Sequence, residues 1–274
     1  MRDLLDGSRR DGFKRIHDLG GFLTGAGTFD AEFFAISRRE AVAMDPQQRV
    51  ALRVAWRALE DAAINPDDLA GHDVGCYVGA SDMRYGPAMA DFSHHSGHLI
   101  TGTSLGVISG RIAYTLGGLA GPAMTVDTSC SSALSAFHVA VQALRSGDCD
   151  LALAGGGVCV MGSPGYFVEF SKQHALSDDG HCRPYSAHAS GTVWAEGGRD
   201  VRPAAQVGGA AGPSPDPRRG QGQLRQSGRR SVGLTAPSPE AQVRLFRRAL
   251  AAAGVAVERW DGGGSRHRHP RRRP

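Results

Sequence analysis

One stretch decides the fold prediction: Gly121-Pro122-Ala123-Met124-Thr125-Val126-Asp127-Thr128-Ser129-Cys130-Ser131-Ser132-Ala133-Leu134. An apolar strand is expected over 122–126, a tight turn of small residues follows, and a helix is expected from Ser131 to Arg145. Cys130 falls where that helix begins. A strand, turn and helix in this order lift the side chain at the turn out of the sheet. They also place it at the positive end of the helix dipole.

Cysteine is a residue type that can become a nucleophile at the start of a helix. A helix N-terminus favours the thiolate, which is the nucleophilic form of cysteine, and the amides of the first helical turn can donate to an oxyanion. The alternative is an inert buried thiol, since free cysteine is among the most buried residue types. On the residues alone both interpretations stay open. The remaining cysteines are predicted to be core or incidentally exposed: Cys76, Cys149, Cys159 and Cys182.

Strands and helices alternate on both sides of this stretch. Ser37 and Glu40 have the spacing of a capping box at the start of a helix. The other elements predicted from apolar periodicity are a helix over 46–63, a strand over 74–80, a helix over 105–116 and a strand over 150–160. The last of these is almost wholly apolar, as strands buried on both faces are. The alternation predicts a layered α/β domain with a substantial parallel component.

Length and composition exclude several classes of protein. The chain has 274 residues, of which 41% are hydrophobic, and this is enough for a packed core. Its longest weakly polar run is too short to span a bilayer, and its first 25 residues are too charged for a signal peptide. Five cysteines without metal-like spacing predict reduced thiols and a cytoplasmic location. Membrane, collagen-like and disulfide-scaffold classes are therefore excluded.

Charge divides the chain into two chemically different parts near Gly198. Residues 1–198 carry a balance of −7 and residues 199–274 a balance of +11, with arginine as the only basic residue of the second part. Nucleic-acid binding by this tail is a remote alternative, because only Phe246 and Trp260 are available for base stacking. The predicted organisation is a domain over 1–198, a disordered Arg/Pro/Gly-rich segment over 199–231, a short helical island over 232–257 and a disordered basic tail over 258–274.

The segment Val126-Asp127-Thr128-Ser129-Cys130-Ser131-Ser132 resembles the active-site signature of β-ketoacyl synthases, especially the ketosynthase domains of modular type I polyketide synthases. Further matching segments lie at 21–23, 33–41, 44–49, 109–114, 148–156, 167–171 and 179–185. Together they cover residues 21–198 nearly continuously, and the island over 232–257 is ketosynthase-like as well.

This resemblance implies a thiolase-like α/β fold, layered α-β-α and represented mainly by its N-terminal half. It also implies that Cys130 accepts an acyl group as a thioester, with its backbone N–H in the oxyanion hole. Decarboxylative Claisen condensation with a malonyl-type extender would follow. The phosphopantetheine that carries both acyl groups belongs to an acyl carrier protein partner, and no cofactor or metal is expected on this chain. The family forms homodimers, which this chain is not expected to form.

The chain also departs from the family pattern. The family's two catalytic histidines, in His-Gly-Thr-Gly-Thr and Gly-His segments, are missing, and neither Lys14 nor Lys172 lies in its lysine motif. Resemblance ends near Gly198, returns over 232–257 and ends again, which indicates truncation and reading-frame shifts in a GC-rich gene. Two hypotheses follow, an acyltransferase of the β-ketoacyl synthase family and a catalytically inactive fragment of one.

Two smaller expectations complete the prediction. The family's apolar opening strand is absent before Gly20, so an unpaired apolar strand edge is expected inside the sheet. The histidines at 94, 95 and 98 have no carboxylate or thiolate partner nearby in the sequence, and no metal site is predicted there.

Overall fold

The computed structural model describes residues 19–85, 97–205, 238–252 and 254–256, with the backbone alone for 199–205. The chain divides into two compact units, Met1–Gln206 and Val207–Pro274, and each is described by itself. The first unit contains the sheet and Cys130.

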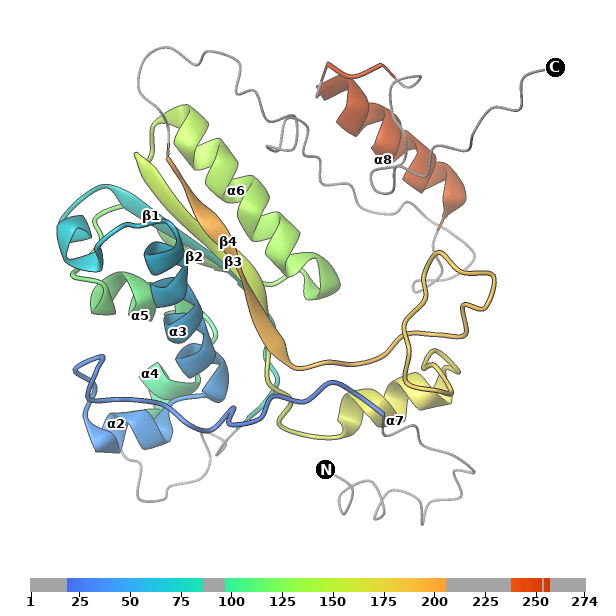
Figure 1. Ribbon diagram of the computed structural model, residues 1–274, viewed down its shortest axis with the longest axis horizontal. Helices are drawn as coiled ribbons and strands as arrows, with labels where there is room; N and C mark the ends of the chain where they lie inside the picture. Colours follow the sequence, from blue (N-terminus) through green and yellow to red (C-terminus); the bar gives the residue numbers. More distant parts are fainter. Residues whose placement is uncertain (1–18, 86–96, 206–237, 253, 257–274) are drawn as a thin grey trace. The chain divides into compact units, whose positions relative to one another are not determined.

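The sheet of the first unit has four strands (Figure 1). They are β1 (Val74–Ala80), β2 (Ala123–Val126), β3 (Leu151–Cys159) and β4 (Gly197–Ala205). Their spatial order is β2-β1-β3-β4, with β1 parallel to both β2 and β3, and β4 antiparallel to β3. The predicted parallel component is therefore confirmed for the first three strands.

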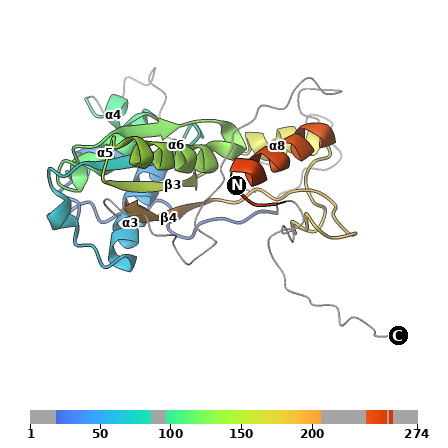
Figure 2. The same ribbon diagram turned by 90° about the horizontal axis from the view of Figure 1, so that it is seen from above.

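Helices surround this sheet and connect its strands. In chain order they are α2 (Arg38–Ala43), α3 (Pro46–Asp61), the 3-10 turn η2 (Pro66–Leu69), α4 (Leu99–Thr103), α5 (Val107–Thr115), the 3-10 turn η3 (Ser129–Ser131), α6 (Ser132–Ser146) and α7 (Gly165–Lys172). Helices α3 and α5 lie on one face of the sheet and α6 lies on the other, lengthwise along β3 (Figures 1 and 2). This is the layered α-β-α arrangement that the sequence predicts.

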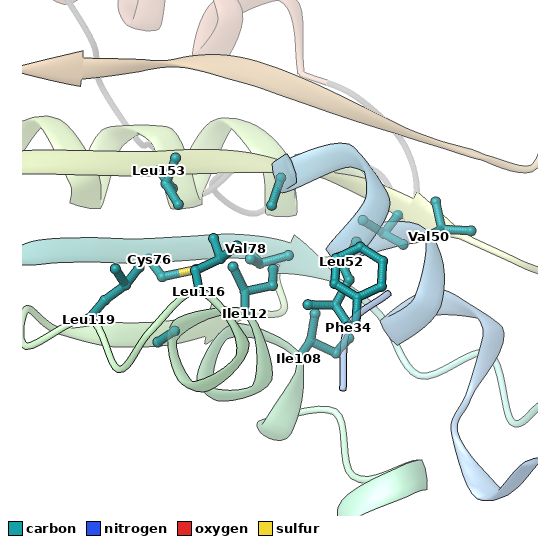
Figure 3. Packing of buried hydrophobic residues seen from close by; sticks show 14 of the residues in the cluster. Phe34, Val50, Leu52, Cys76, Val78, Ile108, Ile112, Leu116, Leu119 and Leu153 are labelled. Carbon is teal, nitrogen blue, oxygen red and sulfur yellow. The ribbon is translucent and has the colours of Figure 1, made fainter. Parts of the chain in front are cut away.

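The two faces of β1 have different partners because successive strand side chains point in opposite directions. Val74, Cys76 and Val78 are buried against α3 and α5, in a core that contains Phe34, Leu52, Ile108 and Ile112 (Figure 3). Tyr77 points to the opposite face and joins the alanines of α6. Each face of the sheet thus has its own hydrophobic core.

Local sequence signals place the ends of the helices. The Ser37 side chain accepts a hydrogen bond from the Glu40 amide at the start of α2, as the capping-box spacing predicts. Asp45 caps α3 in the same way through the amide of Gln47, at 2.7 Å. Gly147 ends α6 with φ +79°, a conformation that glycine adopts without steric cost.

Two expectations differ from the structure. The segment expected to be disordered from residue 199 begins with β4, which continues to Ala205 because its backbone pairs with β3 and needs no apolar periodicity of its own. The unpaired edge expected inside the sheet is absent from the described strands, since β1 pairs directly with β3 from Val74 to Ala80. The rest of 199–231, the start of the island and the basic tail over 258–274 lie outside the described residues.

The second unit contains the helix α8 (Pro239–Ala252). The Ser238 side chain accepts a hydrogen bond from the Ala241 amide at its start, and Glu240 pairs with Arg244 one turn on, at 3.9 Å. The helix falls inside the predicted island. In the part of the chain that is described, no helix is long and apolar enough to cross a membrane.

Candidate active site

Cys130 occupies the middle of η3, between the end of β2 and the start of α6. Its side chain is exposed. No side chain caps the first turn of α6, so none competes with a ligand for the amides there. An accessible thiol beside a helix N-terminus is the arrangement predicted for a nucleophile. The buried-thiol interpretation of Cys130 is therefore wrong.

Two glycines let α6 approach the sheet at this point. A Cβ atom on Gly79 in β1 would lie 2.3 Å from the carbonyl carbon of Ser132, and one on Gly156 in β3 would lie 2.8 Å from the Cα of Ala133. Both distances are shorter than a Cβ atom tolerates, and the opposing atoms belong to the backbone. The backbone of the first turn of α6 therefore contacts β1 and β3 directly. This contact sets how far Cys130 lies above the sheet.

Hydroxyl groups hold the turn around Cys130. The Ser132 hydroxyl accepts from the Thr128 amide at 2.9 Å and donates to the Ser129 carbonyl at 2.6 Å. The Ser131 hydroxyl donates to the Thr128 carbonyl at 2.9 Å, and the hydroxyls of Thr128 and Ser135 are hydrogen-bonded at the same distance. The small polar residues of the signature thus tie the turn to the first two turns of α6.

Asp127 connects the turn to the neighbouring strand, a contact that the sequence analysis missed. Its Oδ1 atom accepts from the Ser129 amide at 2.9 Å and from the Ser81 hydroxyl at 2.7 Å. Ser81 follows β1 directly and lies 46 residues from Asp127 in the chain, so no local pattern reveals the pair.

The other cysteines are less suited to nucleophilic chemistry. Burial, and next the nearby charge of Glu196, raise the pKa of Cys159 to about 11. Burial also raises the pKa of Cys149, which is buried like Cys76. A thiolate is therefore disfavoured at Cys149 and Cys159 at neutral pH. Cys182 is exposed, as predicted for its loop, and is the natural control for Cys130.

Among the described residues, the Cys130 sulfur is in hydrogen-bond contact with the Ser129 hydroxyl, at 3.9 Å, and with no histidine. His138 lies on α6 eight residues after Cys130, about 12 Å along the helix by the usual rise. Its Nδ1 atom is buried without a hydrogen-bond partner in the described structure. His94 and His95 lie outside the described residues, and the residues that are described contain no cluster of three or more metal-binding side chains.

Comparison with known proteins identifies relatives of this chain. The family model for the N-terminal domain of β-ketoacyl synthase matches residues 2–199. Polyketide synthase GfsA of Streptomyces halstedii is 47% identical over 258 residues, which cover 88% of this chain and 3% of that protein. Erythronolide synthase EryA3 of Saccharopolyspora erythraea is 48% identical over 250 residues, which cover 86% of this chain and 7% of that protein.

Solved structures show the same relationship. The oxazolomycin ketosynthase domain OzmH KS7 of Streptomyces albus JA3453 matches with a TM-score of 0.72 and 34% identity, over 86% of this chain and 41% of that one. The ketosynthase from module 6 of the bacillaene synthase of Bacillus subtilis 168 matches with a TM-score of 0.69 and 30% identity, over 85% of this chain and 39% of that one. The chain thus spans about two fifths of these ketosynthase chains and a small part of the curated synthases. It has the thiolase-like fold of their N-terminal half, and it belongs to the β-ketoacyl synthase family.

Proposed function

We propose that this chain is an acyltransferase of the β-ketoacyl synthase type in polyketide biosynthesis and that Cys130 is its acyl-accepting nucleophile. The observation that carries the proposal is the exposed Cys130 thiol, held at the start of α6. The family's relatives in polyketide synthases, which are condensing enzymes, support the reaction class.

The proposed step is a thioester exchange. The Cys130 thiolate attacks the carbonyl carbon of an acyl thioester on the phosphopantetheine arm of an acyl carrier protein. A bond forms between the Cys130 sulfur and that carbon, and the bond from the carbon to the phosphopantetheine sulfur breaks. The phosphopantetheine sulfur leaves as a thiolate and becomes a thiol by taking up the proton that Cys130 released on ionisation. We expect the amide of Cys130 in η3 and the amides at the start of α6 to stabilise the oxyanion that forms in between.

Condensation is a separate step that we expect this chain not to complete alone. It would join the acyl group on Cys130 to the enolate from a decarboxylated malonyl-type extender, and its histidine and lysine motifs are missing from the sequence. The inactive fragment is therefore the alternative function. It is favoured if even the first step fails.

Intact-mass measurement of the purified chain with an acyl thioester separates these functions. The expected result is one acyl adduct on the wild type and on Cys182→Ala, and no adduct on Cys130→Ala. Adding a malonyl thioester should yield no condensed product. A wild type that takes up no acyl group, or loses its adduct only with Cys182→Ala, would overturn the proposal.

The family also suggests partners and a location for this chain. Ketosynthase domains of polyketide synthases work with acyl carrier protein domains and are typically dimeric. For this chain, delivery by an acyl carrier protein and the absence of a homodimer stay predictions, and size-exclusion chromatography with light scattering tests the second.

The cytoplasmic location and the frame-shift origin also stay predictions, and resequencing the gene tests the frame-shift origin. Of the arginine-rich part over 199–274, the structure describes the backbone of 199–205 and the residues of 238–252 and 254–256, and its binding to nucleic acid stays a remote alternative.

A further inference from the structure

The residue before the nucleophile has an unusual backbone conformation. Ser129 has φ +57°, in the left-handed region that residues with a Cβ atom seldom adopt. Such a conformation persists only where surrounding contacts hold it. Because Ser129 directly precedes Cys130, its backbone sets the direction in which the thiol points.

Asp127 supplies the contact that holds this conformation from outside the helix. Its Oδ1 atom accepts the Ser129 N–H at 2.9 Å. The same atom accepts the Ser81 hydroxyl at 2.7 Å, so the carboxylate is itself fixed to the segment that follows β1. Hydrogen bonds to an ionised acceptor are stronger than those between neutral groups.

Ser81 is in turn held by the start of α3. The Gln47 side chain, 1% exposed, donates from Nε2 to the Ser81 carbonyl at 3.1 Å. The Gln47 amide donates to Asp45, the cap of the same helix, at 2.7 Å. A continuous line of hydrogen bonds therefore runs from a buried helix start to the turn that carries Cys130.

We propose that Asp127 is a positioning residue for Cys130, anchored by the Ser81 hydroxyl, and that it holds Ser129 so that the thiol faces an incoming thioester carbonyl. This rests on the proposed function of Cys130. Asp127 need not touch the substrate. Its effect should appear only in reactions that depend on the orientation of the thiol.

Two reactions of the same sulfur distinguish orientation from folding. Acylation by an acyl thioester needs the thiol and the oxyanion-binding amides in one geometry, whereas alkylation by iodoacetamide needs only an accessible thiolate. Both rates would be measured by intact mass on the full chain carrying Cys182→Ala, since Cys182 is exposed as well, with far-UV circular dichroism as the check on folding. The variants are Asp127→Ala, Asp127→Asn and Ser81→Ala.

The chain offers a matched control at the other end of α6. The Ser146 hydroxyl donates to Asp148 at 2.7 Å, the length of the Ser81–Asp127 bond, but 18 residues beyond Cys130. Asp148→Ala breaks this bond and should leave both rates unchanged. Asp127→Asn removes the charge and keeps an oxygen that can accept both hydrogen bonds.

We expect Asp127→Ala to slow acylation about tenfold or more, as the loss of a charged hydrogen bond implies, with alkylation within twofold of the wild type. Ser81→Ala should slow acylation less, and Asp127→Asn should retain most of the rate. Three results would each overturn the positioning role: equal acylation in Asp127→Ala and the wild type, a parallel fall of both reactions, or Asp127→Asn no better than Asp127→Ala.

The proposed function can fail separately. If the wild type is alkylated at Cys130 but never acylated, the proposed function is refuted. The positioning role of Asp127 is then tested by a second measurement. Hydrogen exchange of the Ser129 amide should then be about tenfold faster in Asp127→Ala and unchanged in Asp127→Asn. Unchanged exchange in Asp127→Ala would refute the positioning role as well.

Discussion

The two faces of the sheet are covered by side chains of different size. On the face of α3 and α5 the core holds Leu52, Leu59, Ile108 and Ile112, each 0–2% exposed. On the face of α6 the helix contributes mainly alanines, such as Ala136 and Ala140. Large side chains bury more apolar area, whereas alanines let a helix lie closer to the strands. We therefore expect the first face to contribute more to stability, whereas the second face positions the Cys130 thiol.

Truncating a large side chain on the first face should have the largest effect. Leu52 is fully buried, and Leu52→Ala should lower the free energy of unfolding by about 2–5 kcal/mol, since the lost contacts leave a cavity. Urea unfolding followed by circular dichroism measures the change. Ala140→Gly on the opposite face is the comparison, with an expected loss of about 1 kcal/mol from helix propensity. Equal losses in the two variants would remove the distinction between the faces.

The faces also differ in buried charge. Near the first face, burial raises the pKa of Asp45 from 3.8 to about 6, with a smaller contribution from Asp82, against the opposing hydrogen bond from Gln47. The folded state therefore binds this proton more tightly than the unfolded chain does. The Asp45 contribution to stability is complete below pH 3.8 and is lost as the pH rises through about 6.

Asp45→Asn tests this assignment because asparagine also caps helices well. The stability difference between variant and wild type should change by about 3 kcal/mol between pH 3.5 and pH 7, in favour of the variant at the higher pH. Chemical denaturation at several pH values measures it. A difference that does not vary with pH would contradict the raised pKa.

A methyl group on the second face should move α6 and with it Cys130. Gly79→Ala places a Cβ atom 2.3 Å from the backbone of Ser132, and overpacking of this kind costs about 1–3 kcal/mol. Acylation of Cys130 should fall with it. Gly110→Ala is the matched control within α5, where an added Cβ meets nothing within 4 Å, and it should stabilise by about 0.5–1 kcal/mol. The same sign for both variants would show that α6 does not rest on β1.

Local signals predicted much of this architecture and of its site. The strand over 74–80 and the helix start at Ser37 could be predicted because apolar runs and capping boxes depend on neighbouring residues. The position of Cys130 at the start of a helix could be predicted for the same reason. The family resemblance added the expected reaction.

Long-range pairing supplied what the sequence could not. The residues of β4 have little apolar character, and their strand exists because β3 offers an open edge. The contact of Ser81 with Asp127 and the direct pairing of β1 with β3 likewise join distant residues. Such contacts can be found only in the packed structure, because nothing in the sequence around one residue indicates its distant partner.

The direct contact of α6 with two glycine positions has a consequence for how this protein can diverge. The position of the Cys130 sulfur above the sheet is set by contacts between backbone atoms, so it does not depend on which side chains fill the surrounding core. Core residues on both faces can therefore drift among members of a lineage while the sulfur keeps its position. The two glycines cannot drift with them. Tolerance to mutation should therefore be high among the packed side chains of the two faces and low at Gly79 and Gly156, as it is expected to be low at the hydrogen-bonded residues of the turn.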